Sequence, residues 1–278
     1  MAGGAAMTVK FATNDKIAET SSKGNQEKWR DNGRWYKLDQ FGYEALAETV
    51  ISRLLERSSI ETETPFRFVR YQMERMNVHG RERNGCSSAD FLLPGESIIT
   101  LAHLFKRFDQ SLKEKLTRLP SDKQRIAYLA NAAAELTSLS AFPQYLTMLF
   151  EVDGLFLNDD RHLNNIAVLE KNGRYDYCPI FDNGAGLLSN TQMAPMDIEP
   201  AALVRSAKAR PFQTTFNRQI IHARNLFGPQ LRMPKLTESD IIEELHEPLQ
   251  YYAERDRGII TDRVCQTILL RQKQQSQE

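Results

Sequence analysis

A short β-hairpin predicted inside a helical region is the feature of this sequence that most constrains its fold. The apolar segments 166–169 and 175–181 flank the dipeptide Asn172-Gly173, which favours a tight turn between antiparallel strands. Apolar residues at helical spacing predict helices on both sides of this hairpin. These helical segments are residues 122–139, which Ser121 caps, residues 142–156, and the region from Ile198 onward, with breaks at Pro211, Pro229 and Pro234.

The residues before Pro94 have a different, mixed pattern. We expect short strands joined by turns, together with one main helix. The predicted strands are 8–13, 35–38, 65–72 and 83–93, and the predicted helix is 41–56. The chain is therefore expected to have a bilobal α+β fold, with a small mixed N-lobe at residues 1–94 and a larger, mainly helical C-lobe at residues 95–278.

The charge balance argues against a general nucleic-acid or membrane-surface role. Lys+Arg and Asp+Glu both number 36, whereas such roles usually require a basic excess. A local basic groove stays possible, but no DNA binding is evident. The sequence has no apolar run of the ~20 residues needed to span a membrane and no secretory signal. We expect a cytoplasmic protein, although secretion by a route without a signal stays open.

Polar residues at both ends of the hairpin predict a metal-dependent site. Asp160 and Asn165 lie between the second helix and the hairpin, and Asp182 follows the hairpin, just before Gly184. A hairpin brings its two ends together, so Asn165 and Asp182 are expected to face one Mg²⁺ site, because this ion prefers hard oxygen ligands. Protein kinases use this order of residues, with the first aspartate orienting the acceptor hydroxyl.

Two features of the N-lobe extend this interpretation. Lys37, in a short apolar strand, is predicted to contact the α- and β-phosphates of ATP and to pair with Glu44 of the following helix, which we prefer to Glu48. The loop 21–28 lies where a kinase covers the phosphates of ATP, and its backbone N–H groups and Lys28 could hold phosphate.

These segments together resemble the HipA-like bacterial Ser/Thr kinases, specifically the compact CtkA type. The resemblance covers about Met7 to Phe227. The segments that carry it are a phosphate loop with Ser21, Gly24, Gln26, Glu27 and Lys28; the run 85–92 entering the interlobe hinge; the catalytic loop 158–162 with Asn165; the strand end 181–184; and a basic-Pro-Phe element at 208–212, whose role the sequence does not define.

The resemblance implies a protein-kinase-like fold and an ATP- and Mg²⁺-dependent Ser/Thr protein kinase, possibly autophosphorylating, with ATP and a protein substrate as partners. It implies that Lys37 is the ATP lysine, that Asp160 is the catalytic base, and that Asn165 and Asp182 bind magnesium. The other implied roles are ATP binding by Gly24, Gln26, Lys28, Glu44, Phe91 and Leu93, autophosphorylation at Ser21 or the adjacent Ser22, and bracing of the catalytic loop by His162.

Some alternatives stay open at the level of sequence. Full-length HipA toxins have an extra N-terminal subdomain and an antitoxin partner; we expect the subdomain to be missing here, which puts an antitoxin partner in doubt. The alternative functions are a lipid or small-molecule kinase with the same site and a nucleotide-binding pseudokinase. For Arg161, phosphate binding and simple solvation are equally compatible with the sequence.

Overall fold

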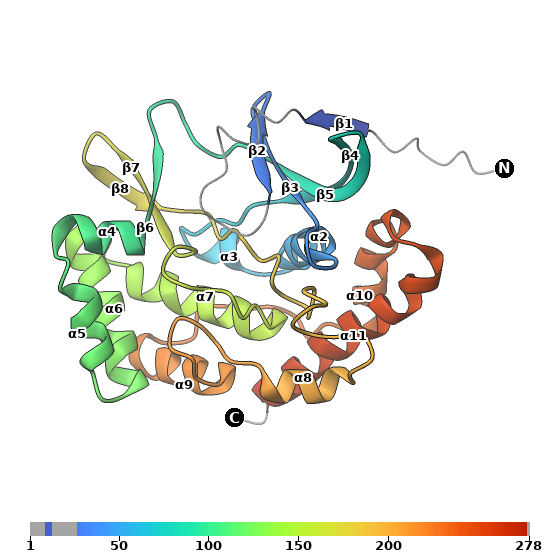
Figure 1. The fold of residues 1–278 in the computed structure, drawn as a ribbon. Coiled ribbons are helices and arrows are strands. Elements are labelled where there is room, and N and C mark those ends of the chain that lie inside the picture. Colours follow the sequence, from blue (N-terminus) through green and yellow to red (C-terminus); the bar gives the residue numbers. More distant parts are fainter. Residues whose placement is uncertain (1–8, 13–26, 277–278) are drawn as a thin grey trace.

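The chain folds into two lobes that differ in composition, as a computed structural model shows for residues 9–12 and 27–276 (Figure 1). The N-lobe is built on a five-stranded sheet and one long helix, whereas the other lobe is mainly helical. The predicted bilobal α+β architecture is therefore confirmed. Within the described residues, no helix is long and apolar enough to cross a membrane.

The N-lobe sheet has the strand order β1-β4-β5-β3-β2. Its β1 is parallel to β4, and the other neighbouring strands are antiparallel. Asn32 and Gly33 join β2 to β3 with φ angles of 48° and 71°, as a two-residue hairpin turn requires. The strands are β1 (Val9–Ala12), β2 (Lys28–Asp31), β3 (Arg34–Leu38), β4 (Tyr71–Val78) and β5 (Arg81–Ala89).

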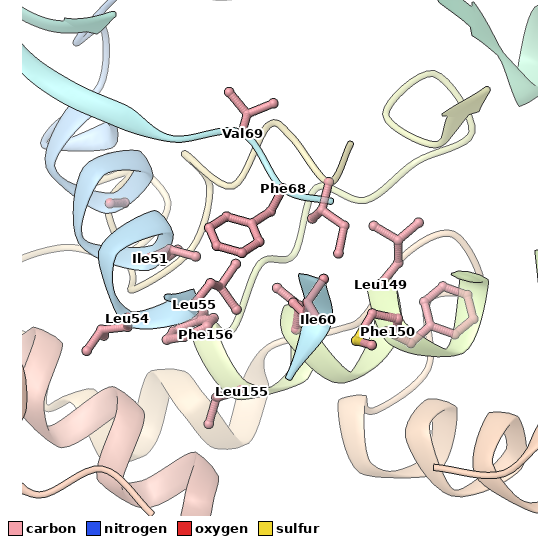
Figure 2. Packing of buried hydrophobic residues seen from close by; sticks show 14 of the residues in the cluster. Ile51, Leu54, Leu55, Ile60, Phe68, Val69, Leu149, Phe150, Leu155 and Phe156 are labelled. Carbon is pink, nitrogen blue, oxygen red and sulfur yellow. The ribbon is translucent and has the colours of Figure 1, made fainter. Parts of the chain in front are cut away.

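Helix α2 (Glu44–Leu55) is placed by a hydrophobic core that continues from one lobe into the other. Figure 2 shows Ile51, Leu55 and Phe156 gathered around the ring of Phe68. Phe156 belongs to α7 (Phe142–Phe156) of the C-lobe, so α2 packs between the N-lobe sheet and the central helix of the other lobe. The burial of these large apolar side chains stabilises α2 by roughly 1.5–3 kcal/mol for each.

The C-lobe surrounds α7 with helices and carries a small antiparallel sheet. Its sheet order is β6-β7-β8, and the predicted hairpin turn is confirmed, since Asn172 and Gly173 have φ angles of 52° and 77°. The predicted cap of Ser121 is also confirmed, because its side chain accepts a hydrogen bond from the backbone N–H of Gln124. The remaining elements are α3 (Ile60–Glu63), β6 (Ser97–Thr100), α4 (Leu101–Phe108), α5 (Leu112–Arg118), α6 (Asp122–Thr137), β7 (Ala167–Lys171), β8 (Arg174–Tyr177), α8 (Pro200–Ser206), α9 (Phe216–Phe227), α10 (Glu238–Leu245), η1 (Pro248–Tyr251) and α11 (Glu254–Ser276).

Two strands have other bounds than predicted, and the segments just beyond them connect the two lobes. The strand expected at 175–181 ends at Tyr177, because Pro179 has no N–H for a ladder hydrogen bond. Ile180 instead forms a parallel bridge with Phe68 in the segment expected to begin the third N-lobe strand. The N–H of Val69 donates to the carbonyl of Ile180 at 2.9 Å. This bridge holds the backbone directly before Asp182 against the N-lobe.

The C-terminal elements return to the N-lobe. In Figure 1, α10 lies beside α2, and both α10 and η1 contact it. The hydroxyl of Tyr252 donates a hydrogen bond of 2.6 Å to the carboxylate of Asp39, which precedes α2. The helix that joins the two lobes is thus held from the C-terminal side as well.

Candidate active site

Lys37 of β3 lies at the centre of a charged group that joins both lobes. Its ammonium donates to the carboxylate of Glu48 in α2 at 2.5 Å and to that of Asp182 at 2.7 Å. Asp182 follows the interlobe bridge and has a left-handed backbone with φ of 62°. This conformation is uncommon for a residue other than glycine, and such strain is often found at functional sites. The structure therefore brings together Lys37 and Asp182, two of the predicted site residues.

The acidic partner of Lys37 is Glu48, which corrects our prediction of Glu44. The carboxylate of Glu44 accepts hydrogen bonds from the backbone N–H groups of Phe41 and Gly42 at 2.8 and 3.1 Å. Glu44 therefore caps the start of α2. Glu48 lies one turn further along, and its second carboxylate oxygen accepts from the N–H of Asn183 at 2.9 Å. Glu48 thus connects α2 to the segment after Asp182.

The charges in this group shift one another's proton affinity. Burial by itself would lower the pKa of Lys37, but the carboxylates of Asp182 and Glu48 raise it well above its ordinary value. Burial would raise the pKa of Asp182, but Lys37 and Lys28 together hold it well below its ordinary value. Burial raises the pKa of Glu48 against the opposing effect of Lys37. Lys37 and Asp182 are therefore both charged at neutral pH.

Lys28 lies next to this group. It is paired directly opposite Lys37 in the β2–β3 ladder, so the two side chains are on the same face of the sheet. Partial burial lowers the pKa of Lys28, the carboxylate of Asp182 opposes that change, and the ammonium of Lys37 adds to it. Two cations of the N-lobe sheet therefore act on the carboxylate of Asp182. The other residues predicted for the phosphate loop, Ser21, Ser22, Gly24 and Gln26, lie outside the described residues.

The segment after α7 that is predicted to be the catalytic loop is fastened by Arg161. This side chain is fully buried and forms an ion pair with Asp153 at 2.9 Å. It also donates to the side chain of Asn183 at 2.7 Å and to the carbonyls of Asn165 and Phe181 at 3.0 and 2.6 Å. One guanidinium thus holds the loop that contains Asn165 against the residue before Asp182. Arg161 is neither solvated nor available to phosphate, so both interpretations from the sequence are wrong.

This arrangement also corrects the predicted bracing role of His162. Its Nε2 lies 3.8 Å from a carboxylate oxygen of Asp160, which is too far for a hydrogen bond. Its Nδ1 is buried and has no hydrogen-bond partner among the described residues. Among the described residues, the ring therefore makes no hydrogen bond that would brace the loop. A buried arginine with several acceptors braces it instead, because its planar guanidinium has five donors in fixed directions.

Asp160 is open to solvent at the surface of the same loop. Its side chain is 47% exposed, and one carboxylate oxygen lies 3.6 Å from the guanidinium of Arg210. Its backbone carbonyl accepts a hydrogen bond of 2.9 Å from the side chain of Asn165. The carboxylate is thus accessible to a substrate hydroxyl, while the backbone of the loop is tied to Asn165.

The site has oxygen donors that suit a divalent cation. The side chain of Asn165 uses its nitrogen to bind the carbonyl of Asp160, and no hydrogen bond of the described residues engages its oxygen. Asp182 uses one carboxylate oxygen for Lys37, so the other is available. Such hard oxygen donors fit Mg²⁺, which usually keeps several water or phosphate ligands. The described residues contain no cluster of three or more acidic, histidine or cysteine side chains that would hold a metal without added water or phosphate ligands.

The segment joining the lobes is a short turn after β5. The carbonyl and the N–H of Leu93 both bond to Glu96, at 2.9 and 2.8 Å, and the side chain of Leu93 is 62% exposed. Phe91 packs against Ala167, Leu169 and Cys178 of the C-lobe. Contact of Phe91 and Leu93 with adenine stays a prediction.

Gly186 is a residue of the site that our reading of the sequence did not identify. A Cβ atom at this position would lie 3.0 Å from the carbonyl oxygen of Phe156 and 3.1 Å from that of Asn183. The absence of a side chain allows the segment after Asp182 to pass directly against α7. The glycine appears in the sequence, but its need becomes visible only when both backbone segments are placed.

Three features of the site define a protein-kinase-like architecture. They are a strand lysine paired with a helix glutamate, an aspartate after a hairpin that contacts this lysine, and a solvent-exposed aspartate. No protein family and no curated protein matches the chain at the level of sequence. Among solved structures, the proinflammatory kinase CtkA of Helicobacter pylori aligns with a TM-score of 0.60 over 92% of this chain and 93% of that one, at 13% identity. HipA from a toxin–antitoxin complex of Shewanella oneidensis aligns with a TM-score of 0.45 over 91% of this chain and 64% of that one, at 14% identity. The CtkA alignment shows that this chain shares the fold of that kinase.

Proposed function

We propose that this protein is an ATP- and Mg²⁺-dependent Ser/Thr protein kinase. The observation that carries the proposal is the contact of Lys37 with both Glu48 and Asp182 across the interlobe cleft. In protein kinases a lysine–glutamate pair and a metal-binding aspartate must both be in place for phosphoryl transfer. Here the ammonium of Lys37 contacts both Glu48 and Asp182. The solvent-exposed carboxylate of Asp160 lies on the neighbouring loop.

Each residue of the site has its own role in the proposed phosphoryl transfer. Lys37 binds the α- and β-phosphates, and Glu48 holds its ammonium in position. Asp160 accepts a hydrogen bond from the acceptor hydroxyl and takes its proton as the oxygen attacks the γ-phosphorus. Arg161 holds this loop in place without contacting substrate. Positioning and electrostatic stabilisation supply most of the rate in such a reaction.

Asn165 and Asp182 would hold magnesium through their side-chain oxygens. When bound, Mg²⁺ neutralises the charge that develops on the phosphate oxygens. Because Arg161 holds the backbone of Asn165 close to Phe181, the two ligand residues are positioned before any metal arrives. Lys37 contacts one oxygen of Asp182 and thereby keeps its carboxylate ionised for the metal.

The test is transfer of label from γ-labelled ATP to a serine-containing protein and to the chain itself, with labelled residues mapped by mass spectrometry. We expect Asp182→Asn to reduce transfer on the order of 1,000-fold, because an amide binds Mg²⁺ far more weakly than a carboxylate. Asp262→Asn on the exposed face of α11 is the matched control and should retain transfer.

Other outcomes would identify the alternatives. Label on Ser21 or Ser22 that is lost in Asp160→Ala would support autophosphorylation as part of the proposal. Nucleotide binding without any transfer would indicate a pseudokinase, and transfer only to a small molecule or a lipid would change the substrate class. Transfer by Asp182→Asn at the wild-type rate would contradict the assignment of the site.

A further inference from the structure

One cation beside Asp160, the guanidinium of Arg210, is not used by the proposed transfer. Lys208 and Arg210 lie on the loop between α8 and α9, and both are exposed, whereas Ala209 between them is buried. The guanidinium of Arg210 lies 3.6 Å from the carboxylate of Asp160, and its side chain is 43% exposed. The loop therefore presents positive charge directly next to the carboxylate that receives the acceptor hydroxyl.

The backbone of this loop is held firmly. The N–H of Ala209 donates to the carbonyl of Thr214 at 2.7 Å. The carbonyl of Arg210 accepts a hydrogen bond of 3.0 Å from the side chain of the buried Gln219. The ring of Phe212 packs edge-on against that of Phe150 in α7, with 6.3 Å between the ring centres. Arg210 is thus fixed at its backbone, while its side chain is exposed beside Asp160.

Arg210 differs from the other cations of the site in its partners. Arg161 is fully engaged by Asp153, Asn183 and backbone carbonyls, and Lys37 is held by two carboxylates. Within the described residues, the guanidinium of Arg210 has the ion pair with Asp160, a longer-range electrostatic attraction to the carboxylate of Asp159, and no hydrogen bond. At 3.6 Å this contact leaves the donors of the guanidinium available.

We propose that Arg210 selects protein substrates that have an aspartate or glutamate next to the acceptor serine or threonine. This inference rests on the proposed kinase function and adds a substrate class to it. An acceptor hydroxyl bound to Asp160 brings its neighbouring side chains within reach of Arg210. A carboxylate there forms a charge-assisted, bidentate pair with the guanidinium, which the carboxylate of Asp160 does not form at 3.6 Å.

The position of Arg210 favours the acceptor over the nucleotide. Lys37 and Lys28 approach the cleft from the N-lobe sheet, where the phosphates of ATP are expected. Arg210 comes from the C-lobe, on the side of Asp160 that is open to solvent. A protein substrate has to approach from this side, because the other side of the loop is fastened to α7 by Arg161.

The experiment uses serine peptides in which one aspartate is moved through the positions around the serine, each with a matched asparagine peptide. For the wild-type protein we expect the ratio of kcat/KM between the best aspartate peptide and its asparagine twin to be about tenfold, as a charge-assisted hydrogen bond would provide. In Arg210→Gln this ratio should approach one, mainly through KM. In Arg210→Glu a lysine at the same peptide position should be preferred instead.

Arg205→Gln is the matched control, since Arg205 is an exposed arginine of the neighbouring helix α8. It should keep the wild-type preference. An equal loss for both peptides in Arg210→Gln would overturn the proposal, because it would show that Arg210 serves Asp160 or the phosphate and not the substrate's charge.

A binding measurement separates this proposal from the kinase assignment. Fluorescently labelled aspartate and asparagine peptides are titrated into wild-type and Arg210→Gln protein in the presence of a non-hydrolysable ATP analogue, and their anisotropy is followed. Tighter binding of the aspartate peptide to wild type alone supports recognition by Arg210 even if no transfer occurs, a result that would refute only the kinase assignment. Equal affinity of the two peptides for wild type would overturn the substrate preference whether or not transfer occurs.

Discussion

Helix α2 takes part in two charge networks on opposite sides, and these differ in burial. The cleft network consists of Lys37, Glu48, Asp182, Asn183, Arg161 and Asp153. The outer network consists of Arg53 of α2 with Glu247, and of Arg57, in the turn directly after α2, with Asp240, Glu243 and Glu244 of α10. Glu48 and Arg161 are buried, whereas the side chains of Arg53 and Arg57 are both 31% exposed.

Similar distances between charged atoms contribute differently to stability in the two networks. Arg57 lies 2.5 Å from Asp240, as close as Lys37 lies to Glu48. In the cleft network, removing one partner leaves a charge buried without compensation, which is costly. In the outer network, water replaces the lost partner, so such pairs contribute at most about 1 kcal/mol. The cleft network therefore defines the geometry of the site, and the outer network only supports the position of α2.

The largest effect on stability is expected from Arg161→Met. This change leaves the buried carboxylate of Asp153 without its cation and removes the links to Asn183 and Phe181. The free energy of unfolding, measured by urea denaturation, should fall by about 3–5 kcal/mol. The double variant Arg161→Met/Asp153→Leu should recover much of this loss. A loss below about 1 kcal/mol in the single variant would place Arg161 with the surface pairs and remove the contrast.

Glu48→Gln should sharpen the assignment of the partner of Lys37. The amide removes the negative charge next to the ammonium and one acceptor for the N–H of Asn183. We expect kcat to fall about 100-fold, as for loss of one electrostatic contact in an active site. Glu44→Gln is the matched control on the same helix, and it should lose far less activity because Glu44 bonds only to backbone N–H groups at the start of α2. The reverse order of effects would restore Glu44 as the partner.

The partly buried contact of Asp39 with Tyr252, beside α2, is expected to respond to pH. Burial raises the pKa of Asp39 from 3.8 to about 7, against hydrogen bonds from Tyr252 and the N–H of Ala45. Because the folded state holds this proton more tightly than the unfolded state, the contribution of Asp39 to stability is complete below pH 3.8 and is lost as the pH rises through about 7. Asp39→Asn is neutral at every pH, so its stability relative to wild type should increase across this range and then stay constant.

Urea denaturation of both proteins at several pH values would measure this difference. Asp176→Asn is a control with an exposed carboxylate on β8, and its difference from wild type should not follow the same curve. A constant difference between Asp39→Asn and wild type would show that Asp39 titrates alike in the folded and unfolded states.

The smallest effect is expected from Arg57→Met in the outer network. The loss of its contacts with Asp240, Glu243 and Glu244 should lower the free energy of unfolding by at most about 1 kcal/mol. High salt should reduce the difference further, because exposed charges are screened. A loss comparable to that of Arg161→Met would show that the contact between α10 and α2 is as important as the buried network.

Local sequence signals predicted much of the fold. The hairpin at Asn172-Gly173 could be predicted because few dipeptides accept a positive φ angle at both residues, as this turn requires. The cap at Ser121 could be predicted because its hydroxyl replaces a missing backbone partner within one turn. Strand β6 could not be predicted in this way, since it depends on pairing with β7. Pro179 is a local signal for the early end of β8, but the bridge of Ile180 to Phe68 that follows it joins distant segments and could not be predicted.

The candidate site shows the same division. The order of Asp160, Asn165 and Asp182 around a hairpin is a local pattern, so the sequence by itself determined which segment contains the proposed chemistry. The choice between Glu44 and Glu48, four positions apart on the same face of one helix, depends on where α2 lies along its own axis. Packing of Ile51 and Leu55 against Phe68 and Phe156 fixes that position (Figure 2). Arg161, His162 and Arg210 are polar residues in loops, and only the tertiary structure decided which of them is buried, because burial depends on residues far away in the chain. The positive charges of Arg161 and Arg210 therefore have different effects. The enclosed guanidinium of Arg161 is structural, whereas that of Arg210 faces water and is available to a ligand.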